Sequence, residues 1–181
     1  TDASLYQGKY YLYFGPVPAA TLMLPYALLT GREMKMGEAA WVFSSLGFLA
    51  ASGLWLALRR RYFPESWLLL APLGVLTIGF GTHLLALAQR PLFWEVSIAA
   101  GVAFTMLSAG AVYWTLHSRR PQLAMALAGL GLGLAVGSRP TWLLALPMLL
   151  APLWLAWRER NPARDWRRLA LAAVVPLGLC G

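Results

Sequence analysis

The chain has 181 residues, of which 59% are hydrophobic and only 12% are charged, and its formal net charge is +8. A water-soluble domain is nearer half apolar and a quarter charged, so this composition excludes an ordinary soluble globule, a disordered chain and a collagen-like chain. The class that remains is a membrane protein with several transmembrane segments. Its positive charge indicates loops that meet anionic lipid, not a surface that binds nucleic acid.

The first apolar stretch, residues 12–30, is interrupted by three prolines. Its part from Val17 to Thr30 would cover about 21 Å as a helix, which is short of the ~30 Å hydrocarbon core. Two interpretations are open at this point: a short first transmembrane span, or a juxtamembrane helix that lies at the interface. The segment is not a signal peptide, because no charged region precedes an apolar core.

Beyond residue 38, apolar runs alternate with short charged loops. The runs are apolar on every face, which predicts transmembrane helices, since membrane strands alternate apolar and polar residues. Pro140 disfavours one continuous helix through the last two full runs, so we predict a helical hairpin with a tight turn at Ser138, Arg139 and Pro140. The predicted spans are 39–58, 67–88, 96–116, 123–137, 141–157 and a truncated one from 169. The fold class is therefore all-α: a polytopic transmembrane helix bundle, in which 12–30 is either a short first span or a juxtamembrane helix near the N-terminus.

Lys and Arg are distributed unequally between alternate loops: one set of loops carries ten and the other carries four. The richer set consists of 59–66, 117–122 and 158–168, and the poorer set of 31–38, 89–95 and 138–140. The positive-inside rule assigns the richer set to the cytoplasm. This asymmetry and the short, proline-interrupted 12–30 run favour the juxtamembrane interpretation. The organisation we predict is an extracytoplasmic loop over 1–38, which contains the juxtamembrane helix, followed by transmembrane helices over 39–181. The arginine clusters of the richer loops are interpreted as topology determinants and contacts with anionic lipid.

The sequence carries no recognisable metal or nucleotide motif. The single cysteine, Cys180, excludes an internal disulfide and a multi-cysteine metal site, and no HExxH, CxxC, Walker A or GxGxxG sequence is present. Gly129, Gly133 and Gly137 form overlapping GxxxG steps, which we interpret as contacts between helices and not as a nucleotide loop. We therefore predict no cofactor and no protein metal site, and a divalent cation would have no visible ligands.

A few polar residues on the predicted outer side are candidates for binding or catalysis. Arg139 lies between two apolar helices, where it either snorkels to a lipid phosphate or clamps the phosphate of a bound substrate. Glu95 either pairs with Arg90 or has a substrate or catalytic role. His83 is either a satisfied intramembrane histidine, bonded to a neighbouring helix, or a catalytic base.

Three sequence elements resemble GT-C glycosyltransferases, which include the dolichyl-phosphate-mannose–protein mannosyltransferases and the lipid A aminoarabinose transferases. The segment GKYYLYFGPVPAATLMLPYALLTGR resembles the first extracytoplasmic loop of these enzymes, in which a Lys-Pro-Pro or His-Pro-Pro element opens a short apolar helix. The segment AGLGLGLAVGSRPTWLLALP is similar to a turn between two spans that reads Thr-Lys-Gly-Pro in the family. The segment RPLFWE occupies the place of an acidic outer loop. In this sequence Lys9 is followed by two tyrosines, where the family has two prolines.

The resemblance implies a membrane glycosyltransferase that moves a sugar from a polyprenyl-phosphate-linked donor to a lipid, glycan or protein acceptor on the extracytoplasmic face. The substrate-binding residues that it implies are Lys9, Tyr10, Arg90 and Arg139. The family's catalytic carboxylate would precede Thr1, so the chain is expected to be an internal fragment that is inactive alone. Asp2 and Glu95 are the carboxylates within the chain that we retain as candidates for the catalytic role.

The alternative is a non-enzymatic polytopic protein, such as a transporter or a scaffold subunit. Transporters usually place broken helices or paired charges at mid-membrane, and no predicted span has a charged residue at its centre. The expected partners are a lipid-linked sugar donor and membrane lipids, without nucleic acid. The expected location is a bacterial inner membrane, which suits the absence of disulfides and the positive-inside loops.

Overall fold

The computed structural model describes residues 3–6, 9–12, 15–81, 92–159 and 165–180. Over these residues the chain is an all-α helical bundle, which confirms the fold class predicted from the sequence. A short antiparallel hairpin precedes the bundle, and the hydropathy pattern did not predict it. Its strands are β1 (Ala3–Tyr6) and β2 (Lys9–Leu12).

Four helical stretches of the described chain are long and apolar enough to cross a membrane, so the chain is a multi-pass membrane protein. They are α2 (Met36–Tyr62), α5 (Phe93–His117), α6 (Pro121–Ser138) and the stretch Pro140–Arg158, in which a 3₁₀ segment η2 (Pro140–Ala145) leads into α7 (Pro147–Glu159). The 27 residues of α2 cover about 40 Å, more than the ~30 Å core. Its polar ends therefore continue beyond the apolar run 39–58 into the interfacial zone.

The remaining helices are shorter. Within the predicted span 67–88 the structure has α3 (Leu70–Gly81), and residues 82–88 lie outside the described part. The predicted segment from 169 lies within α8 (Trp166–Cys180), which begins earlier than the apolar run. The N-terminal stretch forms a π-helical segment, η1 (Ala19–Met23), that continues as α1 (Leu24–Thr30).

Together η1 and α1 form one helix, Ala19–Thr30, of 12 residues. That length covers about 18 Å, too short to cross the hydrocarbon core. The helix ends at Gly31, whose φ of +67° is the left-handed conformation that glycine adopts without strain. A helix of this length suits the juxtamembrane interpretation better than the transmembrane one.

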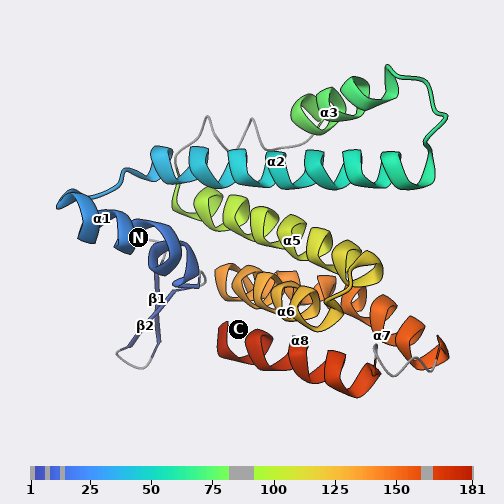
Figure 1. Ribbon diagram of the computed structural model, residues 1–181. Helices are drawn as coiled ribbons and strands as arrows, with labels where there is room; N and C mark the ends of the chain where they lie inside the picture. The colour runs from blue at the N-terminus through green and yellow to red at the C-terminus, as the bar shows by residue number, and fades with distance from the viewer. Residues whose placement is uncertain (1–2, 7–8, 13–14, 82–91, 160–164, 181) are drawn as a thin grey trace.

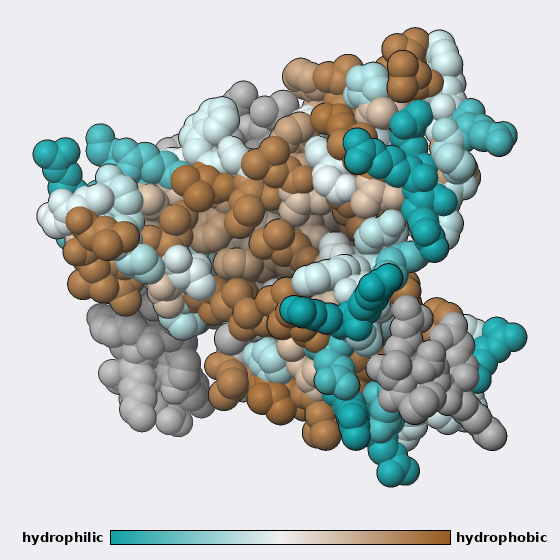
Figure 2. Space-filling view, viewed as in Figure 1, coloured by the Kyte–Doolittle hydropathy of each residue, from teal (hydrophilic) through white to brown (hydrophobic). Residues whose placement is uncertain are grey.

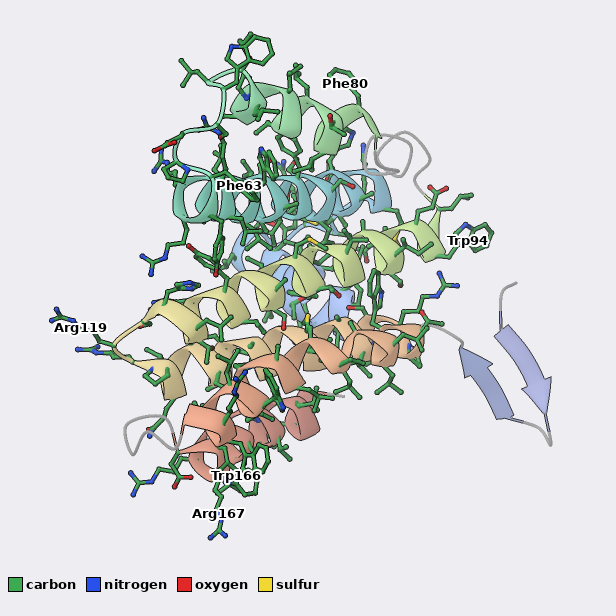
Figure 3. The ribbon with its side chains drawn as sticks, turned by 90° about the vertical axis from the view of Figure 1, so that its right-hand side faces the viewer. Phe63, Phe80, Trp94, Arg119, Trp166 and Arg167 are labelled. Carbon is green, nitrogen blue, oxygen red and sulfur yellow. The ribbon has the colours of Figure 1, made fainter. Side chains whose placement is uncertain are left out.

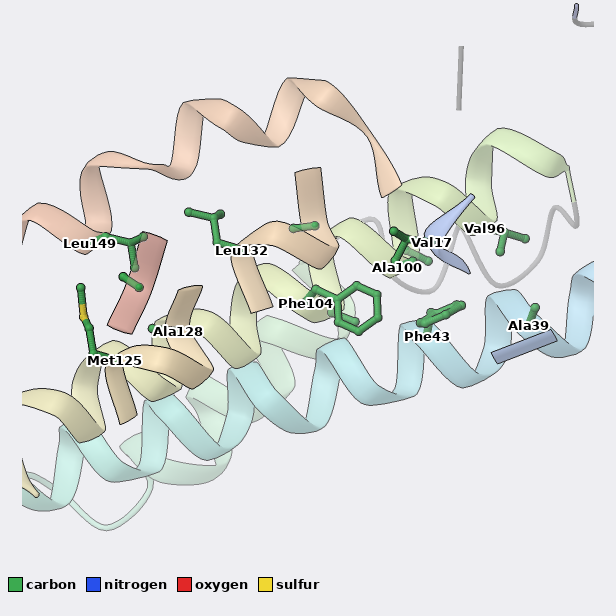
Figure 4. Packing of buried hydrophobic residues seen from close by; sticks show 14 of the residues in the cluster. Val17, Ala39, Phe43, Val96, Ala100, Phe104, Met125, Ala128, Leu132 and Leu149 are labelled. Carbon is green, nitrogen blue, oxygen red and sulfur yellow. The ribbon is translucent and has the colours of Figure 1, made fainter. Parts of the chain in front are cut away.

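The bundle is a stack of helices in which α3, α2, α5, α6 and α8 follow one another (Figure 1). Helix α8 packs against α6 although α7 lies between them in the sequence. The core is built largely from alanines, with Phe43 of α2 and Phe104 of α5 in an edge-to-face contact at 5.8 Å between ring centroids (Figure 4). Small side chains let membrane helices approach closely. The resulting van der Waals packing stabilises the bundle, because the hydrophobic effect does not drive association between helices in lipid.

Two glycines of α6 and one serine of α5 make close contacts between neighbouring helices. A Cβ atom on Gly129 would overlap the backbone of Ala173 in α8, and one on Gly131 would lie 3.1 Å from the carbonyl oxygen of Phe104 in α5. The hydroxyl of Ser108, which is fully buried, donates to the carbonyl oxygen of Ala128 at 2.6 Å. The contact at Gly129 agrees with the interpretation of the GxxxG pattern as helix packing.

The two ends of the bundle differ in charge. At one end, here called the basic end, eight arginines stand against Glu65 and Asp165 among the described side chains. These arginines are Arg59, Arg60, Arg61, Arg119, Arg120, Arg158, Arg167 and Arg168. Figure 2 shows many of these hydrophilic residues on the right of the molecule, beside a largely hydrophobic flank.

The other end, here called the mixed end, carries equal numbers of positive and negative groups among the described side chains. They are Arg32, Lys35, Arg139, Glu33, Glu38 and Glu95. Figure 3 shows Arg119 and Trp94 at opposite ends of the bundle. The separation of charge that the loop counts indicated is therefore present in three dimensions.

Candidate functional site

The candidate site lies at the mixed end, around the turn between α6 and η2. Helix α6 ends at Ser138, because Arg139 is extended (φ −158°, ψ 122°) and Pro140 cannot supply the next N–H. The N–H of Arg139 donates to the carbonyl oxygen of Ala135 at 3.0 Å, and its own carbonyl accepts from the N–H of Trp142 at 3.1 Å. Arg139 is half-buried. As the C-cap residue, Arg139 stands at the negative end of the α6 dipole, which favours a positive charge there.

The N-terminal segment docks directly on this turn. The N–H of Gly15 donates to the carbonyl oxygen of Ser138 at 3.2 Å, which satisfies one of the carbonyls that a helix leaves unpaired at its C-terminus. A Cβ atom on Gly15 would overlap the carbonyl of Gly137. Two residues later Val17 enters the core and is only 9% exposed. The backbone after the β-hairpin is therefore held against the residue that precedes Arg139.

Trp142 fixes the other side of the turn. Its indole lies on Gly101 of α5, where any Cβ atom would overlap the ring. The indole Nε1 is buried and has no hydrogen-bond partner among the described residues. The contact ties the start of η2 to α5, so the backbone is contacted by Gly15 before Arg139 and held on α5 after it. An arginine on an anchored turn loses less conformational freedom when it binds an anion than one on a free loop.

Two glutamates of the mixed end act as helix caps. The Oε2 atom of Glu95 faces the N–H of Leu92 at 3.5 Å, and that of Glu38 accepts from the N–H of Lys35 at 3.1 Å. Each glutamate is the third residue of its helix, where a carboxylate satisfies free N–H groups and complements the helix dipole. Glu95 is 9% exposed. The structure thus gives Glu95 a capping role, beside the pairing and catalytic roles considered from the sequence.

The other predicted site residues are placed only in part. Lys9 begins β2 opposite Tyr6, and Tyr10 follows it opposite Leu5, so Lys9 flanks the turn of the hairpin. The hairpin projects from the bundle at its mixed end (Figures 1 and 3). The structure therefore brings the backbone of the Lys9 segment to the same end as Arg139, without bringing the two residues together in a described contact. Three further predicted residues, Asp2, His83 and Arg90, lie outside the described residues.

The described residues include no group of three His, Cys, Asp or Glu side chains that could hold a metal ion. What the anchored turn can offer chemically is a cationic side chain on a held backbone. Sequence reasoning missed the roles of Gly15, Gly101 and Glu38. Of these, only Glu38 had a local signal, an acidic residue in the first turn of a helix.

No protein-family model, no curated protein and no solved structure matches this chain.

Proposed function

We propose that this chain is part of a membrane glycosyltransferase that uses a polyprenyl-phosphate-linked sugar as donor. The observation that carries the proposal is the hydrogen bond between Gly15 and Ser138, 3.2 Å from nitrogen to oxygen. It joins two segments that are far apart in the sequence and that each resemble the same enzyme family. Such a meeting is expected if both segments serve one site.

The reaction is a displacement at the anomeric carbon of the donor sugar. The acceptor hydroxyl forms the new bond to that carbon and loses its proton to a carboxylate, while the bond between the carbon and the lipid phosphate oxygen breaks. Negative charge develops on the departing phosphate. Arg139 is the residue to which we assign stabilisation of this charge, because a preorganised cation at the leaving group lowers the barrier. Its planar guanidinium can contact two phosphate oxygens at once.

The setting of Arg139 favours this role over simple snorkelling to bulk lipid. A snorkelling arginine needs only a flexible stem and a free path to water. Arg139 is instead half-buried on a turn that Gly15 contacts from one side and that Trp142 anchors to α5 on the other. A cation on an anchored backbone needs less reorganisation when negative charge develops beside it.

The test is the substitution Arg139→Gln in the full-length protein, assayed in native membranes for release of polyprenyl phosphate from a polyprenyl-phosphate-linked sugar. Loss of one preorganised charge beside a developing anion typically lowers the rate by about 10²–10³. Arg139→Lys keeps the charge but not the two-point geometry, so an intermediate rate is expected. Arg32→Gln is the matched control, because Arg32 is an exposed cation at the same end of the bundle and should leave the rate unchanged.

Three outcomes contradict the proposal. Absence of any polyprenyl phosphate release by the full-length wild-type protein would exclude the transferase function. A wild-type rate for Arg139→Gln at matched abundance would exclude the assigned role of this arginine and favour snorkelling. Equal losses for Arg139→Gln and Arg32→Gln would indicate a general charge effect at this end of the membrane, without a specific clamp.

A further inference from the structure

The basic end contains a hollow beside the start of α6. It has a volume of about 370 Å³ and is lined by Arg119, Arg120, Pro121, Gln122 and Leu123. Both arginines are exposed, and neither has an acidic partner among the described residues. We call this feature the Arg119 hollow. Figure 3 shows the Arg119 side chain extending away from the helices.

A contact between α2 and α5 lies near the hollow in the sequence and brings a second arginine-bearing segment to the same end of the bundle. The hydroxyl of Tyr62 and the Nε2 atom of His117 are 3.2 Å apart, which joins the C-terminus of α2 to the C-terminus of α5. The triplet Arg59–Arg61 ends immediately before Tyr62, and Arg119 follows two residues after His117. Arginines of two loops therefore flank the contact between α2 and α5, although Arg59 also donates to the carbonyl of Ser66 at 3.0 Å. Such a cluster attracts anions over roughly a Debye length.

An apolar groove lies along the flank of α5 and α6. Its volume is about 440 Å³, and its lining includes Leu107, Gly110 and Trp114 of α5 together with Leu127 and Leu130 of α6. We call it the α5–α6 groove. A Cβ atom built on Gly110 would meet nothing within 4 Å, so this glycine borders open space. Trp114 is 41% exposed, as expected of an indole near the membrane–water interface.

The hollow and the groove share one stripe of α6. Leu123 lines the Arg119 hollow, and Leu127, Leu130 and Leu134 line the α5–α6 groove. These residues are spaced by four, three and four positions, which places them on one face of the helix. A cationic hollow and an apolar groove thus follow one another along a single helix face. A molecule with an anionic head and an apolar chain would match both.

We propose that this face binds an anionic phospholipid as an ordered ligand, with its headgroup phosphate at Arg119 and Arg120 and one acyl chain in the α5–α6 groove. The charge at the hollow selects an anionic headgroup over a zwitterionic one. The groove distinguishes an ordered lipid from the diffuse attraction that any basic loop exerts. The inference does not depend on the proposed transferase function.

The experiment reconstitutes the protein in phosphatidylcholine nanodiscs with or without phosphatidylglycerol, and counts retained lipid by native mass spectrometry after transfer to detergent. Wild-type protein is expected to retain phosphatidylglycerol in preference to phosphatidylcholine. Each arginine near a membrane surface contributes about fivefold to the attraction of an anionic lipid. The double substitution Arg119→Gln with Arg120→Gln should therefore lower retention by more than about tenfold.

A second variant tests the groove alone. Gly110→Leu keeps all of the arginines and fills the groove with a side chain that meets no backbone, so it should also release the lipid. Gly53→Leu is its matched control, because a Cβ atom there also meets nothing within 4 Å and Gly53 does not line the groove. Arg32→Gln is the control for charge, because Arg32 lies at the mixed end.

Several results would overturn the proposal. Full retention by the double arginine variant would remove the headgroup site. Full retention of the lipid by Gly110→Leu would mean that the groove does not contribute and that only diffuse electrostatic attraction holds the lipid. Equal retention of phosphatidylcholine and phosphatidylglycerol by the wild-type protein would remove the selectivity. Two results together would indicate a site for free phosphate ions. Millimolar inorganic phosphate would displace the lipid, and Gly110→Leu and Gly53→Leu would lose the same amount of retained lipid.

Discussion

The N–H of Gly15 donates to the carbonyl oxygen of Ser138 across 3.2 Å, and this bond attaches the N-terminal segment to the end of a transmembrane helix. The contact depends on the absence of a side chain, since a Cβ atom on Gly15 would overlap the carbonyl of Gly137. It also depends on the end of α6, because carbonyls in the last turn of a helix lack an intrahelical N–H partner. The two requirements together fix the segment beside Arg139.

The first prediction concerns this contact. Gly15→Ala should detach the N-terminal segment, because the added methyl group meets backbone atoms that cannot move aside. Limited proteolysis in nanodiscs should then cleave near Val17, which the wild-type protein keeps 9% exposed. Gly53→Ala is the control, since its methyl group meets nothing within 4 Å. If Val17 is equally protected from proteolysis in Gly15→Ala and Gly53→Ala, the segment stays attached despite the added methyl group, and the prediction is wrong.

The second prediction concerns the contact between α6 and α8. Gly129→Leu should destabilise the bundle, because any Cβ atom there overlaps the backbone of Ala173. Overpacking of a close contact costs about 1–3 kcal/mol. Thermal unfolding in detergent should show a lower midpoint for Gly129→Leu than for Gly53→Leu, whose surroundings are open. Similar midpoints for the two variants would argue against a tight α6–α8 interface.

The third prediction concerns the buried hydrogen bond between α5 and α6. Ser108→Ala removes the hydroxyl that donates to the carbonyl oxygen of Ala128 at 2.6 Å. Hydrogen bonds between membrane helices contribute about 0.6 kcal/mol on average and at most about 1.7 kcal/mol. A small loss of stability in that range is expected, measured by equilibrium unfolding in mixed micelles. A loss of several kcal/mol would mean that Ser108 also supports packing that the hydroxyl alone does not explain.

The fourth prediction concerns orientation. The basic end should face the cytoplasm, because it carries eight arginines against two acidic residues among its described side chains, whereas the mixed end is balanced. Single cysteines in a Cys180→Ser background can be probed in intact cells with an impermeant thiol reagent. Glu33→Cys, at the mixed end, should react in intact cells. Glu65→Cys, at the basic end, should react only after the membrane is permeabilised, and the reverse pattern would invert the orientation.

Hydropathy alone located most of the helices. The runs 39–58, 96–116, 123–137 and 141–157 all lie within helical stretches that are long enough to cross a membrane. This success has a simple physical basis, since hydrocarbon demands that every backbone group be satisfied within its own segment, so a long apolar run can only be a helix. The predicted ends of the helices were less accurate, because polar residues such as Glu38 and Arg59–Arg61 extend α2 beyond its apolar run.

The candidate site was predicted less completely. Arg139 was selected from its sequence context, a cation between two apolar runs, and that local signal was enough to draw attention to the turn. No local signal could show that Gly15 would meet Ser138 or that Gly101 would receive the indole of Trp142, because these partners are far apart in the chain. The β-hairpin was also missed, since a four-residue strand pair carries too little hydropathy pattern to be seen.

The sequence by itself determined the membrane class, the helical fold and the uneven distribution of charge between the loops. These properties follow from composition and local spacing, because the bilayer selects each apolar span by its length and each loop by its charge, independently of how the helices pack. Only the tertiary structure decided which helices pack together: α8 lies against α6, and Gly129 meets Ala173. Helices in lipid gain little from burying apolar surface, so their partners are chosen by shape and by a few polar contacts, and shape appears only when the helices are assembled.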